Sequence, residues 1–126
     1  MKRVLLIDDT PQIAELLTFG LRDLGYEVIP SGYAIDVEHL AARYEVAAVV
    51  LDCAVYDSSE SLFDTLREDE RHRALPVVII TDTPDEAVAS LRARQAQRVL
   101  LVPKPFTAGQ VATALGQLLD AGGSEV

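Results

Sequence analysis

The chain has 126 residues, of which 49% are hydrophobic and 25% are charged, proportions that suit one folded domain with one core. Its formal net charge of -9 argues against nucleic acid or an anionic membrane as the main partner, because both would repel the protein. The apolar runs are too short for a membrane helix or a secretory signal, and the single cysteine, Cys53, excludes an internal disulfide, so we expect a cytoplasmic protein.

The predicted elements begin with a strand over Val4–Ile7, an apolar run that is followed directly by acidic residues. A helix is predicted from Pro11, because Thr10 suits the N-cap, proline suits the first helical position, and the apolar residues that follow lie on one helical stripe. Gly25 is the expected end of this helix. A second strand is predicted over Tyr26–Ile29, an apolar run that starts directly after the glycine.

The middle of the chain continues this alternation of helices and strands. A helical pattern over residues 37–44 precedes a third strand, Val46–Leu51, and a helical pattern over residues 62–66 precedes a fourth, Val77–Ile80. Several strands are apolar at consecutive positions, which is typical of strands covered on both faces. The segment TPDE, residues 83–86, has the spacing of a capping box and predicts a fourth helix.

The last predicted strand is Val99–Val102, and a fifth helix follows it, since Thr107 and Gln110 repeat the capping spacing. Five strands alternating with five helices, joined by crossovers long enough for a helix, predict an α/β fold with a doubly wound parallel sheet. We expect one domain over residues 1–121 and a flexible tail over residues 122–126.

Polar residues follow the predicted strands where each strand ends. Asp8 and Asp9 follow the first strand, Asp52 ends the third, Thr81 ends the fourth and Lys104 comes just after the fifth. Ligands of such sheets bind beyond these carboxyl ends. Three converging carboxylates would repel one another unless a hard cation such as Mg²⁺ or Mn²⁺ lay among them. With a metal and a lysine to neutralise a phosphoryl group, Asp52 can act as its nucleophile and form an acyl phosphate.

At these residues the chain resembles the receiver domains of response regulators in two-component signalling. The matching segments are VLLIDDTPQIAELLTFGLRDLGYEV near the N-terminus, VVLD around Asp52, VVIIT around Thr81 and PKPF around Lys104. The resemblance covers essentially all of residues 2–120. It implies a flavodoxin-like receiver fold with five helices and the strand order 2-1-3-4-5.

By this resemblance, Asp52 accepts a phosphoryl group from a sensor histidine kinase or a phosphotransfer protein. Thr81 and Lys104 would contact phosphoryl oxygens, and the peptide bond between Lys104 and Pro105 would be cis. The resemblance implies signalling through protein contacts with an unidentified output protein, and the family often forms homodimers. It implies no enzyme beyond self-phosphorylation and self-dephosphorylation.

The same resemblance implies a magnesium site in which Mn²⁺ can substitute for Mg²⁺. Asp9 would bind the ion directly and Asp8 mainly through water. Asp52 and the backbone carbonyl of Ala54 would complete the set of protein ligands.

Four features depart from the pattern of the family. Asp82 stands where a small residue is usual, and this extra acid would slow phosphorylation, attract cations or turn outward. Leu101 replaces the aromatic residue that reports the phosphorylation state, so we expect that readout to be altered or absent. The loop CAVYDSSES after Asp52 lacks the usual Pro-Gly, and ARQAQR before the last strand lacks the usual Ala-Gly-Ala turn.

Each of these polar residues also has a purely structural alternative. An acidic pair such as Asp8 and Asp9 is often a helix cap, and Asp52 could cap the loop that follows it. Thr81 could cap the following turn, and Lys104 could be a surface lysine. These alternatives predict no ligand at the edge of the sheet.

Two other functions stay open at the level of the sequence. A pseudo-receiver, which would act as a constitutive protein-interaction module without phosphorylation, is favoured by Asp82 and Leu101. A phosphohydrolase with an aspartate nucleophile after the first strand is a weaker alternative. Such enzymes resemble Asp-x-Asp at that position, whereas this chain has Asp8 and Asp9 adjacent and followed by Thr10.

Overall fold

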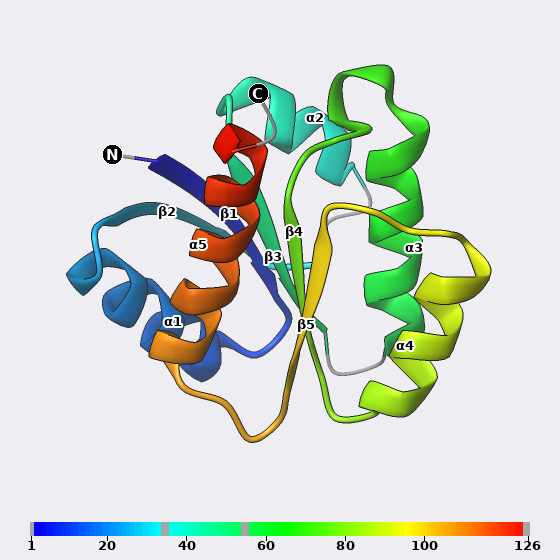
Figure 1. The fold of residues 1–126 in the computed structure, drawn as a ribbon. Coiled ribbons are helices and arrows are strands. Elements are labelled where there is room, and N and C mark those ends of the chain that lie inside the picture. The colour runs from blue at the N-terminus through cyan, green and yellow to red at the C-terminus, as the bar shows by residue number, and fades with distance from the viewer. Residues whose placement is uncertain (1, 34–35, 54–55, 125–126) are drawn as a thin grey trace.

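The computed structural model describes residues 2–33, 36–53 and 56–124, which form a parallel sheet of five strands with helices on both faces (Figure 1). In chain order the elements are β1 (Lys2–Asp8), α1 (Pro11–Asp23), β2 (Tyr26–Ser31), α2 (Val37–Arg43), β3 (Ala48–Asp52), α3 (Tyr56–Glu68), a 3₁₀ turn (Glu70–His72), β4 (Val77–Thr81), α4 (Pro84–Ala93), β5 (Val99–Pro103) and α5 (Ala108–Ser124). The strand order β2-β1-β3-β4-β5 confirms the predicted doubly wound, flavodoxin-like architecture.

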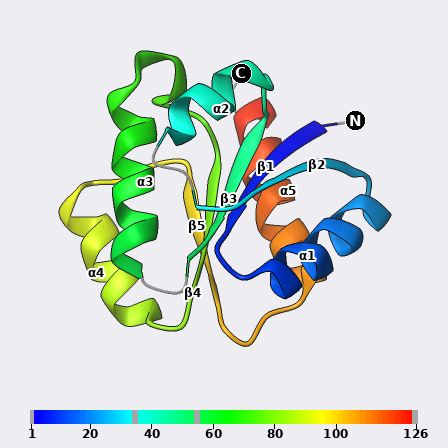
Figure 2. The ribbon, with the colours of Figure 1, turned by 180° about the vertical axis from the view of Figure 1, so that it is seen from behind.

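Two apolar clusters fill the space on the two sides of the sheet. Along β1, Val4 and Leu6 pack with α1 and α5, whereas Leu5 and Ile7 pack with α2, α3 and α4. All four side chains are fully buried, as the continuous apolar run predicted for a strand covered on both faces. Figures 1 and 2 show the two groups of helices on opposite sides of the sheet.

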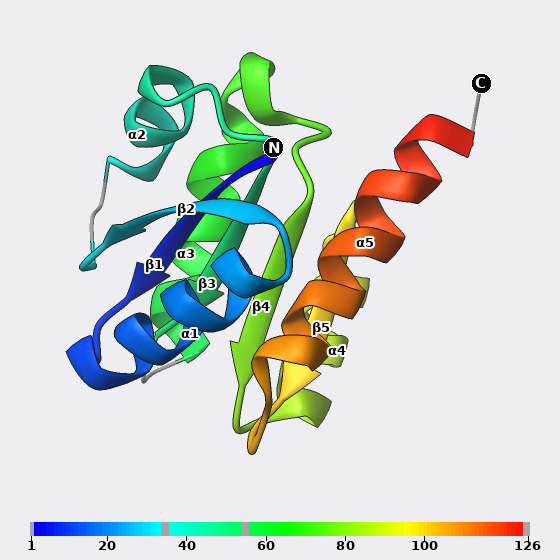
Figure 3. The ribbon, with the colours of Figure 1, turned by 90° about the vertical axis from the view of Figure 1, so that its left-hand side faces the viewer.

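The register of the parallel strands brings their carboxyl ends to one edge of the sheet. Asp8 pairs with Asp52 across β1 and β3, and Thr81 pairs with Pro103 across β4 and β5. In Figures 1 and 3 this edge lies at the bottom, while β1 begins and α5 ends near the top. The predicted polar residues therefore occupy the end of the sheet that is remote from both ends of the described chain.

Several boundaries differ from those that the sequence predicted. The third strand begins at Ala48 rather than at Val46, because the Val46 N–H donates to the Ala41 carbonyl at 3.2 Å in the turn that ends α2. Helix α5 runs to Ser124 and so continues beyond residue 121, where we placed the end of the domain. That domain boundary stays a prediction. Neither α5 nor any other helix in the described ranges is long and apolar enough to cross a membrane.

The turn between α4 and β5 forms without the glycine that is usual in the family. Gln95 and Arg98 adopt left-handed backbone conformations, with φ angles of 52° and 59°. The Ala96 N–H donates to the Leu91 carbonyl at 3.0 Å and closes the last turn of α4. The segment ARQAQR therefore still ends the helix and leads into the strand.

Helix α4 is tied to α3 by a network around Arg94. The Arg94 guanidinium donates to Asp64 Oδ1 at 2.8 Å, to the Ser90 carbonyl at 3.1 Å, and to Glu60. The hydrogen bonds that Arg94 donates to Asp64 and then to Glu60 raise the pKa of Arg94 above its ordinary value. The network joins the C-terminal end of α4 to the middle of α3.

Candidate functional site

Asp8 and Asp52 form the centre of the polar edge. They are the last residues of β1 and β3, they are partners in register, and they are 4% and 2% exposed. Asp8 Oδ1 accepts the backbone N–H of Thr10 at 2.8 Å, so this carboxylate supports the turn into α1. Asp9 follows Asp8 directly and is exposed.

Lys104 supplies the positive charge that pairs with this buried acid. Its Nζ lies 3.1 Å from Asp52 Oδ1, and its side chain is 27% exposed. The Lys104 backbone N–H donates to the Thr81 carbonyl at 2.8 Å, which fixes the lysine beside the end of β4. The peptide bond between Lys104 and Pro105 is cis, as the resemblance implied. Lys104 is therefore not a free surface lysine.

Thr81 is buried at the end of β4, and its hydroxyl is engaged. Thr81 Oγ1 accepts the backbone N–H of Thr83 at 3.0 Å and lies 3.2 Å from Thr83 Oγ1. The residue is 3% exposed. Thr81 therefore caps the turn after β4, as its structural alternative predicted. It lies at the same edge of the sheet as Asp52 and Lys104.

Two carboxylate oxygens of this centre have no hydrogen-bond partner within the described residues. These oxygens are Asp8 Oδ2 and Asp52 Oδ2, and both are buried. A buried acceptor without a partner is costly, so such atoms call for a cation or a proton. Burial, followed by the charge of Asp52, a hydrogen bond that protonated Asp8 would donate to Asp52, and the charge of Asp9, raises the pKa of Asp8 to about 7 even though the Thr10 N–H opposes the shift.

The donor set suits a hard divalent cation, since the unpartnered atoms are carboxylate oxygens. The His, Cys, Asp and Glu side chains of the described ranges nevertheless form no group of three or more already placed to hold a metal ion. The carboxylates would therefore have to turn toward one another when they bind a metal. The expected ligand carbonyl of Ala54 lies outside the described residues.

The departures from the family pattern lie around this centre. Asp82 is exposed on the turn after β4, whereas Leu101 is half-buried and packs against the cluster under α3 and α4. Cys53 is buried, and burial raises the pKa of its thiol, so it acts as a small core residue. Leu101 brings no polar atom to the edge of the sheet.

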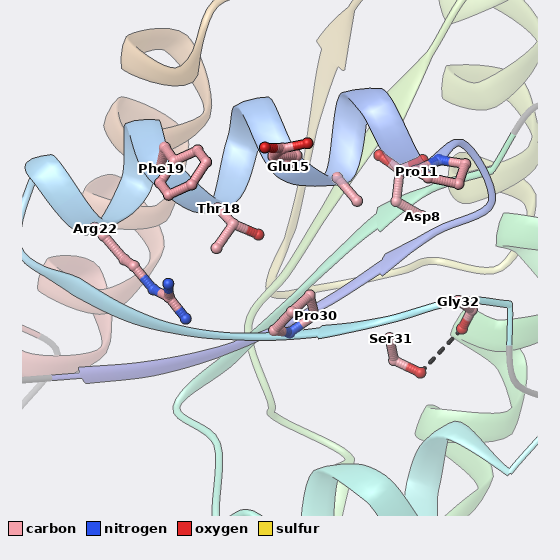
Figure 4. A pocket seen from close by; sticks show the side chains of 10 residues that line it. Asp8, Pro11, Glu15, Thr18, Phe19, Arg22, Pro30, Ser31 and Gly32 are labelled. Atoms are coloured by element: carbon pink, nitrogen blue, oxygen red, sulfur yellow. Dashed lines mark hydrogen bonds between the residues drawn. The ribbon is translucent and has the colours of Figure 1, made fainter.

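A groove between α1 and β2 borders the site at Asp8 (Figure 4). Its volume is about 440 Å³. Figure 4 shows Thr18 and Arg22 along the helix side and Pro30 on the strand side. The sequence did not predict this groove, because no predicted site residue lies in β2 and the packing of α1 against β2 depends on the fold.

The residue that sequence reasoning missed is Thr83. The capping-box pattern of residues 83–86 predicted that its hydroxyl would cap α4, but Thr83 is an N-cap without a side-chain capping bond. Its hydroxyl contacts Thr81 instead. The Thr-x-Thr spacing at a strand end was the available signal, since it places two hydroxyls on one short turn.

Comparison with proteins of known sequence relates this chain to bacterial regulators, although no family model matches it. It is 31% identical over 119 residues to the probable transcriptional regulatory protein TcrX of Mycobacterium tuberculosis, which covers 92% of this chain and 49% of that protein. It is 32% identical over 82 residues to the DNA-binding dual master transcriptional regulator RpaA of Synechocystis sp., which covers 64% of this chain and 34% of that protein. The chain thus spans half or less of the length of these relatives.

Solved structures match over almost the whole chain. A sensor protein from Polaromonas sp. JS666 superposes with a TM-score of 0.84 at 26% identity, covering 95% of this chain and 97% of that one. The chemotaxis response regulator CheY4 of Vibrio cholerae gives 0.79 at 21% identity, covering 94% and 99%. The receiver domain of sensor histidine kinase PA1611 from Pseudomonas aeruginosa, which holds a magnesium ion in its active-site cleft, gives 0.74 at 21%, covering 94% and 98%.

The sequence comparison and the fold comparison agree with each other. The sequence relatives are regulators that match along this chain, and the fold relatives are receivers and response regulators that match over nearly all of it. The acidic strand ends Asp8 and Asp52, with Lys104 beside them, lie at the edge where the fold places a ligand. The chain therefore has the receiver fold, and its sequence relatives are bacterial transcriptional regulators, as the resemblance to receiver domains of two-component response regulators implied.

Proposed function

We propose that this receiver domain accepts a phosphoryl group on Asp52, with Mg²⁺ held by Asp8, Asp9 and Asp52. The observation that carries the proposal is the state of the Asp52 carboxylate. It is 2% exposed, Oδ1 is paired with Lys104 at 3.1 Å, and Oδ2 has no partner among the described residues. A buried carboxylate with one oxygen held and the other unpartnered is suited to nucleophilic attack.

In the proposed reaction, a bond forms between Asp52 Oδ2 and the phosphorus of the donor. The bond from phosphorus to the histidine nitrogen of the donor breaks, and its electron pair stays with the imidazole. The bound cation would neutralise charge on the phosphoryl oxygens. Lys104, whose Nζ lies 3.1 Å from Asp52 Oδ1, would donate to one phosphoryl oxygen, and buried Thr81 would donate its hydroxyl hydrogen to another.

The donor in this proposal is a sensor histidine kinase or a phosphotransfer protein, and the protein signals in the cytoplasm through contacts with an output protein. A homodimer is a second way in which the signal could be passed on. The net charge of -9 supports protein partners over nucleic acid. In this proposal the acyl phosphate of Asp52 is the signalling state of the protein. The reaction is limited to gain and loss of this phosphoryl group.

A constitutive interaction module is the second candidate, and two observations favour it. The Thr81 hydroxyl already contacts the Thr83 hydroxyl. Leu101 packs in the apolar cluster, and leucine has neither the ring nor the hydroxyl of the aromatic residue that it replaces. In that function the ion pair between Lys104 and Asp52 would be a permanent structural contact. The pocket would then hold its present arrangement in every state of the protein.

Incubation with acetyl phosphate and Mg²⁺, followed by intact mass measurement, distinguishes these candidates. We expect one phosphoryl adduct that is absent from Asp52→Asn and present in Asp23→Asn, which changes an exposed acid at the end of α1. The absence of an adduct from the wild-type protein under all conditions would favour the constitutive module. Turnover of an added phosphate ester without an adduct would instead indicate a phosphohydrolase.

A further inference from the structure

We propose that Thr83 is a positioning residue for Thr81 and that its hydroxyl changes partner when Asp52 is phosphorylated. Before phosphorylation it holds the Thr81 hydroxyl, and afterwards it caps the N-terminus of α4. This inference rests on the proposed function of the Asp52 pocket. It gives the domain a polar link between the pocket and a helix on its surface.

The first step is the pair of contacts that Thr83 makes with Thr81. The Thr83 backbone N–H donates to Thr81 Oγ1 at 3.0 Å, and the two hydroxyl oxygens lie 3.2 Å apart. Thr81 is 3% exposed, so no bulk water competes for these bonds. In the described part of the chain, Thr83 is therefore the residue that orients the Thr81 hydroxyl.

The second step is the bonding capacity of a hydroxyl group, which has one hydrogen and two lone pairs. One lone pair of Thr81 Oγ1 already accepts the Thr83 N–H. If the Thr81 hydrogen is donated to Thr83 Oγ1, it is not available to a phosphoryl oxygen, which can only accept. Phosphorylation of Asp52 would require that hydrogen, and the hydroxyl of Thr83 would lose it.

The third step is the state of the helix that Thr83 begins. Thr83 is the N-cap of α4 and its carbonyl accepts the Ala87 N–H at 3.0 Å, but its side chain makes no capping bond. The first N–H groups of a helix have no partner within the helix, and an N-cap hydroxyl normally accepts from one of them. The contact with Thr81 thus occupies the group that would otherwise cap α4.

The fourth step concerns Leu101 on β5, which replaces the aromatic residue that reports phosphorylation in the family. Leu101 pairs with Ile79 across β4 and β5 and packs in the apolar cluster. Its side chain has no polar atom that could form a hydrogen bond when Thr81 moves. Thr83 contacts Thr81 directly and also begins a surface helix, so it can carry the same information by hydrogen bonds.

Amide hydrogen exchange of residues 85–87, at the start of α4, tests this proposal in the whole protein. We expect exchange there to slow by about fivefold when acetyl phosphate and Mg²⁺ phosphorylate the wild-type protein, because capping stabilises the first turn. Thr83→Val should lose this slowing, while Thr83→Ser should keep it since serine retains the hydroxyl. Thr107→Val is the matched control, because Thr107 Oγ1 does cap α5 by accepting the Gln110 N–H at 3.1 Å.

The intact mass of each sample shows whether Asp52 is phosphorylated, so a failure of the acceptor function can be distinguished from a failure of the role of Thr83. An adduct with unchanged exchange in the wild-type protein would overturn the role of Thr83 and leave the acceptor function intact. Equal slowing in wild type and Thr83→Val would also overturn it. The absence of any adduct would overturn both the acceptor function and the role that rests on it.

Discussion

Lys104 and Asp52 form the one ion pair at the described edge of the sheet in which the acid is buried. A buried carboxylate requires a partner, and the arriving phosphoryl group requires the same positive charge. In the proposed function, a single lysine therefore has a structural role before phosphorylation and a chemical role during it. This double role explains why the lysine lies close to the strand end although its side chain reaches solvent.

The sequence contains only two lysines, which allows a matched test of this role. Lys104→Ala should reduce the rate of phosphorylation by acetyl phosphate by about a hundredfold, because a charged donor to the phosphoryl oxygens is removed. Lys2→Ala, at the exposed start of β1, should leave that rate unchanged. Equal rates for both variants, measured by adduct formation over time, would remove Lys104 from the site.

The raised pKa of Asp8 predicts that the stability of the metal-free protein depends on pH. Its pKa is raised from 3.8 to about 7 on folding, mainly by burial, so the folded state binds this proton more tightly than the unfolded state. The contribution of the proton to stability is complete below about pH 4 and is lost as the pH rises through about 7. Urea denaturation in EDTA should show this loss in the wild-type protein.

Asp8→Asn is the comparison that isolates this contribution, since asparagine does not titrate. The difference in the free energy of unfolding between variant and wild type should grow in favour of the variant between about pH 4 and 8. A constant difference over that range would mean that Asp8 has an ordinary pKa in the folded protein.

The position of these residues could be predicted from the sequence, but their partners could not. Strand-end acids must meet at one edge of a parallel sheet, so Asp8 and Asp52 followed from the strand pattern alone. The hydrogen bond of the Thr81 hydroxyl depends on the side-chain rotamer of Thr83, and the sequence shows only two threonines with one residue between them. Its contact had to come from the structure.

At the scale of elements, α1 and α5 approach closely at one glycine. A Cβ built on Gly20 would overlap the Cβ of Ala108, the first residue of α5. Gly20→Ala should therefore destabilise the protein by about 1 kcal/mol, since the steric overlap exceeds the gain in helix propensity. Gly116→Ala in α5 meets no atom within 4 Å and should stabilise the protein slightly.

Chemical denaturation of both glycine variants measures this prediction, and Ala108→Gly in the Gly20→Ala background should restore part of the loss. Stabilisation by Gly20→Ala equal to that by Gly116→Ala would show that α1 and α5 are not in close contact. The sequence alone ranks the two glycines equally, because both interrupt a helical pattern.

The order and type of the elements could be predicted because apolar periodicity and capping residues act locally. Their ends were less predictable, because contacts beyond the element decide them. Val46 belongs to an apolar run, yet its N–H closes the end of α2 and the strand starts later. Gln95 takes a left-handed conformation at the end of α4, in a segment without glycine, which the sequence did not predict.

At the scale of the whole molecule, the net charge of -9 and the buried acids predict that the stability of the fold depends on cations. Mg²⁺ at ~100 times its dissociation constant should raise the free energy of unfolding by about 2.7 kcal/mol, because it binds only the folded state. Thermal unfolding with Mg²⁺, against NaCl at equal ionic strength, separates binding from charge screening. Asp9→Ala should lose most of the stabilisation, and an equal effect of the two salts would exclude a specific site.

The central claim is that Asp52 is a metal-dependent phosphoryl acceptor, and mapping the phosphoryl group to a residue tests it most directly. The protein is treated with acetyl phosphate, with either Mg²⁺ or EDTA, and the acyl phosphate is located by peptide mass spectrometry after reduction with borohydride. The account predicts modification of Asp52 alone, present with Mg²⁺ and absent with EDTA. Modification of Asp8 or Asp9 in place of Asp52, or modification of Asp52 that is equal with and without metal, would contradict it.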